Sequence, residues 1–178
     1  ALTLWEKRSF HPALDLMKAV VDERDKQKKS DLYDNKWVES MLNLAGIYRD
    51  LNDWENTKKI HQQILEYDQK MTASNPQYKW TLARDHNNLG LILYMEACGK
   101  EKESERKTLM ESSVKELEKA LALWKETKGP DSVSEANTLW NLYLVERDLG
   151  LKRESRETKM KAESIDKKAG HKAYSPVY

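Results

Sequence analysis

The sequence predicts an all-α protein built from repeated helical hairpins. The dipeptide Asn-Leu occurs three times in matching surroundings, at residues 43–44, 88–89 and 141–142. Each copy lies in a stretch with helical spacing of apolar residues, and a second amphipathic stretch follows it. No long run of alternating β-branched residues predicts a strand. Such recurrence indicates stacked helical repeats, which build extended binding surfaces rather than catalytic pockets.

Length and composition agree with a helical repeat protein. The chain has 178 residues, of which 34% are charged, with only six Gly and four Pro, as is typical of long solvated helices. The net charge of +1 gives no support to nucleic-acid binding. No apolar run approaches the roughly 18–20 residues that a membrane-spanning helix needs. Cys98 is the one cysteine; it excludes an intrachain disulfide and says little else about the compartment. The location is left unknown, with the cytoplasm slightly favoured.

Apolar spacing and capping residues define the expected helices of the N-terminal half. A short helical stub over 2–8 precedes a helix over about 12–26. The second of these looks like the closing helix of a truncated hairpin, because it carries its own apolar stripe. That stripe consists of Ala13, Leu16, Met17, Val20 and Val21. A helix over about 34–51 follows, and Asp53 is expected to cap another that ends near Met71.

Gly and Pro divide the rest of the chain into four expected helices. Asn75 and Pro76 predict an N-cap and the first residue of a helix. The charged segment 99–107 is expected to be an insertion or a frayed turn. The four helices are expected over about 76–98, 108–128, 132–149 and 152–169, and the tail 170–178 is expected to be loose. Residues 1–169 are therefore predicted to form a single repeat domain.

Apolar stripes on these helices predict how the hairpins pack. One stripe consists of Met41, Leu44, Ala45 and Tyr48, and another of Val114, Leu117, Ala120, Leu121 and Trp124. Burying one leucine contributes about 1.5–3 kcal/mol. A single hairpin cannot hide its whole stripe, so neighbouring hairpins are expected to cover it.

These patterns resemble the tetratricopeptide repeat (TPR) family in its longer, kinesin-light-chain-like form. The first-helix pattern reads Asn-Leu-Ala-Gly-Ile-Tyr at 43–48, Asn-Asn-Leu-Gly-Leu-Ile at 87–92 and Trp-Asn-Leu-Tyr-Leu-Val at 140–145. The second-helix pattern places a small residue three positions after a large apolar one, as in Phe10…Ala13, Trp54…Thr57 and Met110…Ser113. Gly129-Pro130-Asp131 is similar to the turn between repeats in that family.

The resemblance covers about residues 10–169 and implies a TPR-like right-handed superhelix of antiparallel helix pairs, with about three and a half repeats. Three residues depart from the pattern. Tyr143 stands where Ala45 and Gly90 are small, Ile64 also replaces a small residue, and Lys152 stands in the third repeat where an apolar residue is expected. The third repeat is therefore expected to be an atypical terminal repeat, as repeat arrays need for solubility.

In this family the first helix of each repeat lines a concave groove, so the resemblance implies a scaffold or adaptor that binds a peptide or helix of a partner protein. The expected partner-binding residues are Asn43, Asn88, Asn141, Arg84, Arg49, Arg147, Tyr94, Trp140, Asn87 and Asn137; Gly46 and Asp50 lie on the same predicted face. Asn amides suit a peptide backbone, and Trp, Tyr and Arg are enriched at interface hot spots. The alternative is that the Asn row is structural and bonds to neighbouring helix backbones.

The sequence gives less support to other functions. A basic clamp for an acidic chaperone tail is disfavoured, because Glu39 and Asn137 stand where cations would be required. Self-association through the apolar edge of the N-terminal helix, or service as an accessory segment of a larger complex, remains an alternative. Lys and Arg outnumber acids by eight to four over 152–172, an excess that could meet an acidic partner, RNA or lipid headgroups. However, Glu and Lys mix along this segment at helical spacing, which usually marks a solvated face. His86 and Cys98 lack partners in a known spacing, so no catalytic residue, metal or cofactor is expected.

Overall fold

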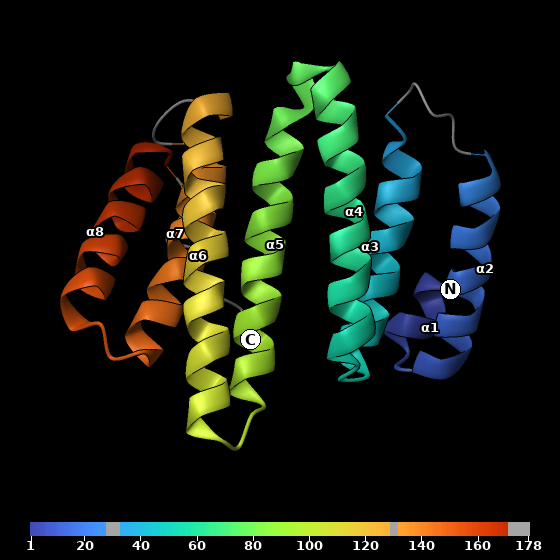
Figure 1. Ribbon diagram of the computed structural model, residues 1–178, viewed down its shortest axis with the longest axis horizontal. Helices are drawn as coiled ribbons and strands as arrows, with labels where there is room; N and C mark the ends of the chain where they lie inside the picture. The colour runs from blue at the N-terminus through green and yellow to red at the C-terminus, as the bar shows by residue number, and fades with distance from the viewer. Residues whose placement is uncertain (28–32, 129–131, 171–178) are drawn as a thin grey trace. The chain divides into compact units, whose positions relative to one another are not determined.

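The computed structural model describes residues 1–27, 33–128 and 132–170, and every regular element in these ranges is helical (Figure 1). The prediction of an all-α fold of helix pairs is therefore confirmed. The chain divides into two compact units, Ala1–Pro76 and Gln77–Tyr178. The single domain expected over residues 1–169 stays a prediction.

The first unit contains four helices in chain order. They are α1 (Leu2–Glu6), α2 (Phe10–Gln27), α3 (Asn35–Asp50) and α4 (Trp54–Ser74). Helix α3 contacts both α2 and α4 along its length, and the three run side by side in Figure 1. Their shared core includes Ala13, Met17, Met41, Ile47 and Ile64, all buried. The apolar stripe predicted on α3 therefore packs as expected, while Leu16 and Val20 of α2 remain exposed.

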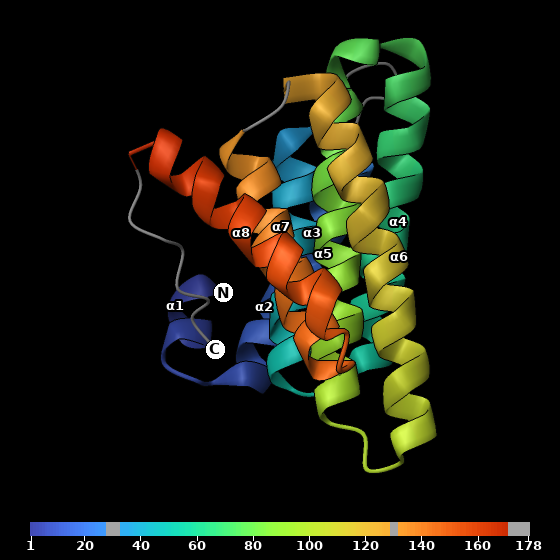
Figure 2. The ribbon, with the colours of Figure 1, turned by 90° about the vertical axis from the view of Figure 1, so that its left-hand side faces the viewer.

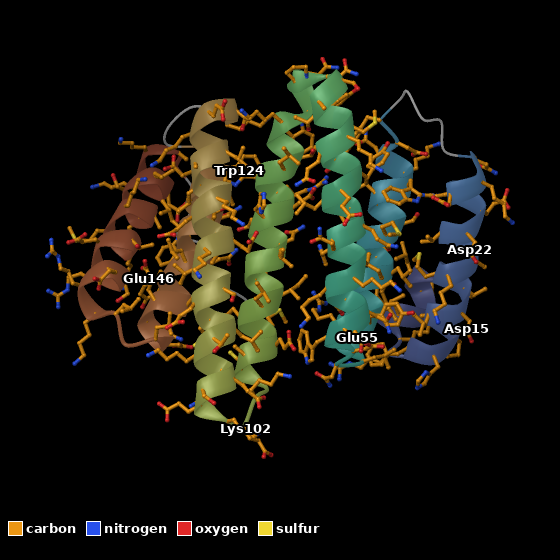
Figure 3. All side chains as sticks on the ribbon, viewed as in Figure 1. Asp15, Asp22, Glu55, Lys102, Trp124 and Glu146 are labelled. Atoms are coloured by element: carbon orange, nitrogen blue, oxygen red, sulfur yellow. The ribbon has the colours of Figure 1, made fainter. Side chains whose placement is uncertain are left out.

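The second unit contains two hairpins that follow the short 3-10 turn η1 (Pro76–Tyr78). Its helices are α5 (Lys79–Cys98), α6 (Glu103–Lys128), α7 (Val133–Asp148) and α8 (Lys152–Lys168). Lys102 lies at the tip of the connection between α5 and α6 (Figure 3). Helix α7 contacts α5, α6 and α8, and Figure 2 shows α8 inclined to α6. Leu117, Ala120, Leu139 and Ile165 are among the buried residues that hold these helices together.

Capping side chains explain where several helices begin. The Asp53 carboxylate accepts a hydrogen bond from the Asn56 backbone N–H at 3.1 Å, so the predicted cap of α4 is confirmed. Asp34 caps α3 and Ser132 caps α7 in the same manner. Each cap satisfies a backbone donor that has no partner within the first helical turn.

One predicted boundary was wrong and another differs in detail. Asn75 ends α4 and donates its backbone N–H to Met71, and Pro76 begins helical structure as predicted, but as a 3-10 turn that leads directly into α5. Helix α6 begins at Glu103 rather than near residue 108, because the charged segment contains no helix-breaking residue after Gly99 and its acidic residues favour a helix N-terminus. The predicted turn at 129–131 and the tail from residue 171 onward lie outside the described residues.

A left-handed residue recurs at the end of three first helices. Arg8, Asn52 and Gly150 have φ angles of 57°, 59° and 77°. The next residue in each case donates its N–H to a carbonyl five positions back: Ser9 to Leu4, Asp53 to Tyr48 and Leu151 to Glu146. This shared turn makes α1 and α2 a hairpin whose first helix is short, which agrees with the truncated repeat expected from the sequence.

Small residues allow helices α5 and α6 of the second unit to pack closely. A Cβ atom at Gly90 would lie 2.7 Å from Cγ of Leu117 and 3.2 Å from the carbonyl oxygen of Ser113. The Ser113 hydroxyl also donates to the Gly90 carbonyl at 2.6 Å. Tyr143 takes the equivalent place in α7 and packs edge-on against Trp140, with ring centroids 5.8 Å apart. The third hairpin therefore replaces close backbone contact with aromatic packing.

Candidate functional site

The first helices of the second unit present a polar face that we call the α5–α7 face. It comprises Arg84, Asn87, Asn88, Leu91 and Met95 of α5 with Asn137, Asn141 and Arg147 of α7. The α5 residues are spaced at intervals of three and four, so they share one side of the helix. They are half-buried, while Asn137 and Arg147 are exposed. Both α5 and α7, the first helices of the two hairpins of the second unit, contribute to this face.

An amide pair links the two helices of this face. Asn141 donates from Nδ2 to Oδ1 of Asn87 at 3.0 Å, and Asn141 is only 9% exposed. This contact supports the structural alternative for these two residues, although the partner is a side chain rather than a helix backbone. Asn88 and Asn137 keep accessible amides that can both donate and accept hydrogen bonds.

Arg84 is held in place by its neighbours. Its Nε and Nη2 donate to Oδ1 of the buried Asp85 at 3.0 and 2.8 Å, and its guanidinium lies over the Trp80 ring, 5.7 Å from the centroid. Stacking and a carboxylate partner fix the orientation of a planar guanidinium. Arg84 therefore supports the fold as well as presenting a cation on this face.

Tyr94 and Arg147 meet at Asp148. The Tyr94 hydroxyl donates to Oδ2 of Asp148 at 2.6 Å, and Nε of Arg147 donates to Oδ1 at 2.7 Å. Burial and the hydrogen bond to Asp148 raise the pKa of Tyr94 well above its ordinary value, so the phenol stays protonated. Burial alone would raise the pKa of Asp148, but the bonds from Arg147 and Tyr94 outweigh it and lower that pKa. The Tyr94 hydroxyl therefore links α5 to α7 through this hydrogen bond.

Trp140 lies in the core of the second unit. It is 6% exposed, and its indole N–H donates to Oδ2 of Asp166 at 2.8 Å. A buried ring with a satisfied donor has no free surface for a partner, so the structure supports a packing role for this residue. Sequence periodicity missed this because α7 is buried on several sides, by α5, α6 and α8.

In the first unit, α1 covers part of the predicted binding face of α3. A Cβ atom at Gly46 would lie 2.5 Å from the Trp5 ring, and the Trp5 indole donates to Oδ2 of Asp50 at 2.7 Å. Arg49 is bound to the same carboxylate through Oδ1. Asn43 is half-buried on the same helix. The face of α3 around Gly46 is thus occupied by a side chain of the chain itself.

Outside the α5–α7 face, the titratable groups of the described residues form no metal site. Among the described residues, no group of three or more His, Cys, Asp or Glu is placed to hold a metal ion. His86 contacts Glu116, with Nδ1 and Oε2 2.6 Å apart. Burial opposes ionisation of Glu116, but hydrogen bonds from Lys119 and His86 outweigh it and lower its pKa. Within the part of the chain that is described, no helix is long and apolar enough to cross a membrane.

Glu146 is expected to destabilise the second unit at neutral pH. It is 8% exposed, and its Oε2 is buried without a hydrogen-bond partner among the described residues. Burial raises its pKa, repulsion from Glu154, Glu118 and Glu157 adds to this, and a hydrogen bond with Thr158 opposes it. The pKa of Glu146 in the folded chain exceeds its unfolded value near 4.5. The ionised carboxylate therefore lowers the free energy of unfolding at neutral pH, and this loss disappears as the pH falls through the folded pKa toward 4.5.

Glu146→Gln should therefore raise the melting temperature near neutral pH, and the gain should shrink toward pH 4.5. Thermal unfolding followed by circular dichroism at both pH values would measure this. Glu101→Gln, in the exposed connection before α6, is the matched control and should change neither value. A gain for Glu146→Gln that does not depend on pH would contradict the assignment.

The helix pairs, their left-handed turns and the polar first-helix face define a TPR-like helical-repeat fold, and comparison with solved structures agrees. The chain is similar to TPR-like repeats of a protein assigned as a kinesin light chain of Podosopora anserina, with a TM-score of 0.60 and 16% identity over 93% of this chain and 71% of that one. A Q17M variant of the same repeats gives a TM-score of 0.61 at 16% identity, over 94% and 71% of the two chains. No protein-family model and no curated protein matches the sequence.

Proposed function

We propose that this chain is a protein-interaction module that binds a peptide or helix of a partner protein on the α5–α7 face. The observation that carries the proposal is the pair of accessible amides, Asn88 and Asn137, on first helices that an Asn141–Asn87 bond holds in fixed register. Amides on rigid helices can pair with a peptide backbone at little cost in side-chain entropy. Leu91 and Met95 add apolar contact surface on the same side of α5.

The charges on this face set the kind of segment that it would bind. Arg147 is exposed but shares its charge with Asp148, and Arg84 shares its charge with Asp85. Each cation therefore has a compensating carboxylate, so the face is polar rather than strongly basic. We infer that it prefers a polar segment with an apolar anchor over a highly acidic one, which agrees with the sequence argument against a chaperone-tail clamp.

The test is peptide selection followed by substitution. Peptides selected from a random library on the intact chain should lose about tenfold or more in affinity when Asn88 and Asn137 are both replaced by Ala, since tenfold corresponds to about 1.4 kcal/mol. Lys115→Ala with Lys125→Ala on the exposed side of α6 is the control. Arg84 is left intact, because its loss would also remove the partner of the buried Asp85. Equal affinity for both double variants would rule out the α5–α7 face.

A further inference from the structure

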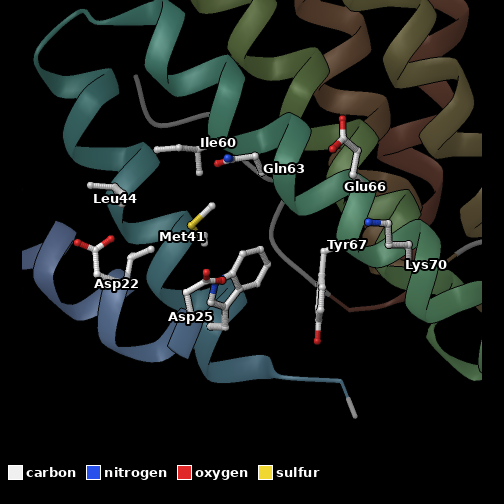
Figure 4. Close-up of a pocket in the computed structure, with 11 residues that line it drawn as sticks. Asp22, Asp25, Met41, Leu44, Ile60, Gln63, Glu66, Tyr67 and Lys70 are labelled. Carbon is white, nitrogen blue, oxygen red and sulfur yellow. The ribbon is translucent and has the colours of Figure 1, made fainter. Parts of the chain in front are cut away.

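The first unit contains a pocket between α2 and α4 with α3 as its floor (Figure 4). Its volume is about 470 Å³, within the range of roughly 300–1,000 Å³ that ligand pockets occupy. Trp37, Met41 and Leu44 of α3 form the floor, and Val21 and Ile60 line the sides. The bottom of the pocket is therefore apolar and suited to one unbranched or branched aliphatic side chain.

The rim of the pocket is acidic. Asp22 and Asp25 lie on the α2 side, while Glu66 and Lys70 lie on the α4 side (Figure 4). Three carboxylates and one ammonium group give the rim a formal charge of −2 (−3 + 1). All four residues are exposed at the mouth. An apolar floor with an acidic rim is complementary to an apolar side chain flanked by cations.

The second unit shows what fills this place in another repeat. Glu135 and Lys161 follow Trp37 and Gln63 by 98 residues, the offset that also separates Asn43 from Asn141. There Nζ of Lys161 on α8 lies 2.7 Å from Oε1 of Glu135, which is 1% exposed. The third repeat thus brings its own lysine to a carboxylate at this place. In the first repeat Trp37 and Gln63 take these two places, so the ion pair is replaced by an apolar floor and a neutral amide.

Helix α8 carries a surface that matches the pocket. Met160 is 63% exposed, more than any other large hydrophobic residue among those described. Arg156 lies one helical turn before it and Lys167 two turns after it, and both are exposed. Positions 156, 160 and 167 share one side of the helix, together with Glu163, whose Oε1 lies 3.7 Å from Nζ of Lys159. We propose that this side of α8 in one molecule binds the α2–α4 pocket of a second copy, with Met160 against the apolar floor.

The proposed contact joins two different surfaces, so it is head-to-tail. Each copy would have one pocket and one α8 surface to offer, and the mass of the assemblies should rise continuously with protein concentration unless the array closes into a ring. Because exposed charges contribute to the contact, added salt should weaken it. None of the residues involved belongs to the α5–α7 face, so the function proposed above is independent of this contact.

Sedimentation velocity over a range of protein concentrations tests the role of the acidic rim of the pocket. The wild-type chain should associate at low salt, and Asp22→Lys with Glu66→Lys should weaken association by about tenfold or more. Asp15→Lys with Glu55→Lys is the matched control, since it makes the same change in charge on the same two helices outside the pocket (Figure 3). A wild-type chain that stays monomeric, or equal loss in both double variants, would overturn the proposal.

A mixing experiment tests the pairing itself. Arg156→Glu with Lys167→Glu should also weaken self-association by about tenfold or more, because it removes the basic partner of the pocket rim. Mixing this variant with the Asp22→Lys, Glu66→Lys variant pairs the intact pocket with the intact α8 surface and the basic pocket with the acidic α8 surface, so association should return. Circular dichroism establishes that each variant is folded. Two folded variants that remain monomeric when mixed, while the wild type associates, would show that the contact lies elsewhere.

Discussion

Replacing Trp140 by Ala is expected to lower the free energy of unfolding by about 3–5 kcal/mol, the range for removing a large buried aromatic side chain. The ring is 6% exposed, and its loss also removes the hydrogen-bond donor to the buried Asp166. Urea denaturation followed by circular dichroism would measure the change. The effect is large because packing and a buried hydrogen bond are lost together.

Two companion variants separate these causes. Trp140→Phe keeps most of the ring but leaves Asp166 without this donor, and should cost about 1–3 kcal/mol. Val133→Ala, at an exposed residue of the same helix, should stay within about 0.5 kcal/mol of the wild type. If Trp140→Ala left stability unchanged and only weakened partner binding, the buried position described for this residue would be refuted.

Leu117→Ala is the second substitution with a large expected effect, a loss of about 2–5 kcal/mol. Leu117 is fully buried in the core of the second unit and touches α5 at Gly90. Removing it deletes apolar contacts and leaves a cavity that the surrounding helices can only partly close. Lys115→Ala, at an exposed position on the same helix, is the control.

The contact between Leu117 and Gly90 allows a double-mutant cycle. Gly90→Ala alone should cost about 1–3 kcal/mol, because the new methyl group would overlap Cγ of Leu117. Combined with Leu117→Ala, the methyl group enters space that the leucine has vacated, so the double variant should lose less stability than the sum of the two single variants. Strict additivity would contradict this contact. Gly99→Ala should be tolerated, since its Cβ atom would meet nothing closer than 3.6 Å.

The two interaction proposals concern different chemistry, although the second unit supplies both the α5–α7 face and the α8 surface. The α5–α7 face offers amides and compensated cations, whereas the α2–α4 pocket offers an apolar floor beneath an acidic rim. A chain that associates through α8 can still present the α5–α7 face, because the residues of the two surfaces do not overlap. Variants in one surface should therefore leave binding at the other unchanged.

Local signals in the sequence determined the helical class, the pairing of helices and most helix ends. The Asn-Leu recurrence, the period of the apolar stripes and the cap at Asp53 depend on neighbours within a few residues, and such signals can be read without a structure. The end of α4 and the start of α6 were misplaced, because Asn75-Pro76 and a charged run are each compatible with more than one local structure.

Only the tertiary structure decided which polar and aromatic residues are available to a partner. Tyr94, Trp140 and Asn141 have the residue types of a binding site, yet they bond to Asp148, Asp166 and Asn87 across helix contacts. Trp5 reaches Gly46 and Asp50 from about forty residues away, and the α2–α4 pocket is lined by three separate helices. A hydrogen bond between distant residues depends on how helices pack, and helical periodicity specifies the side of one helix but not what lies against it.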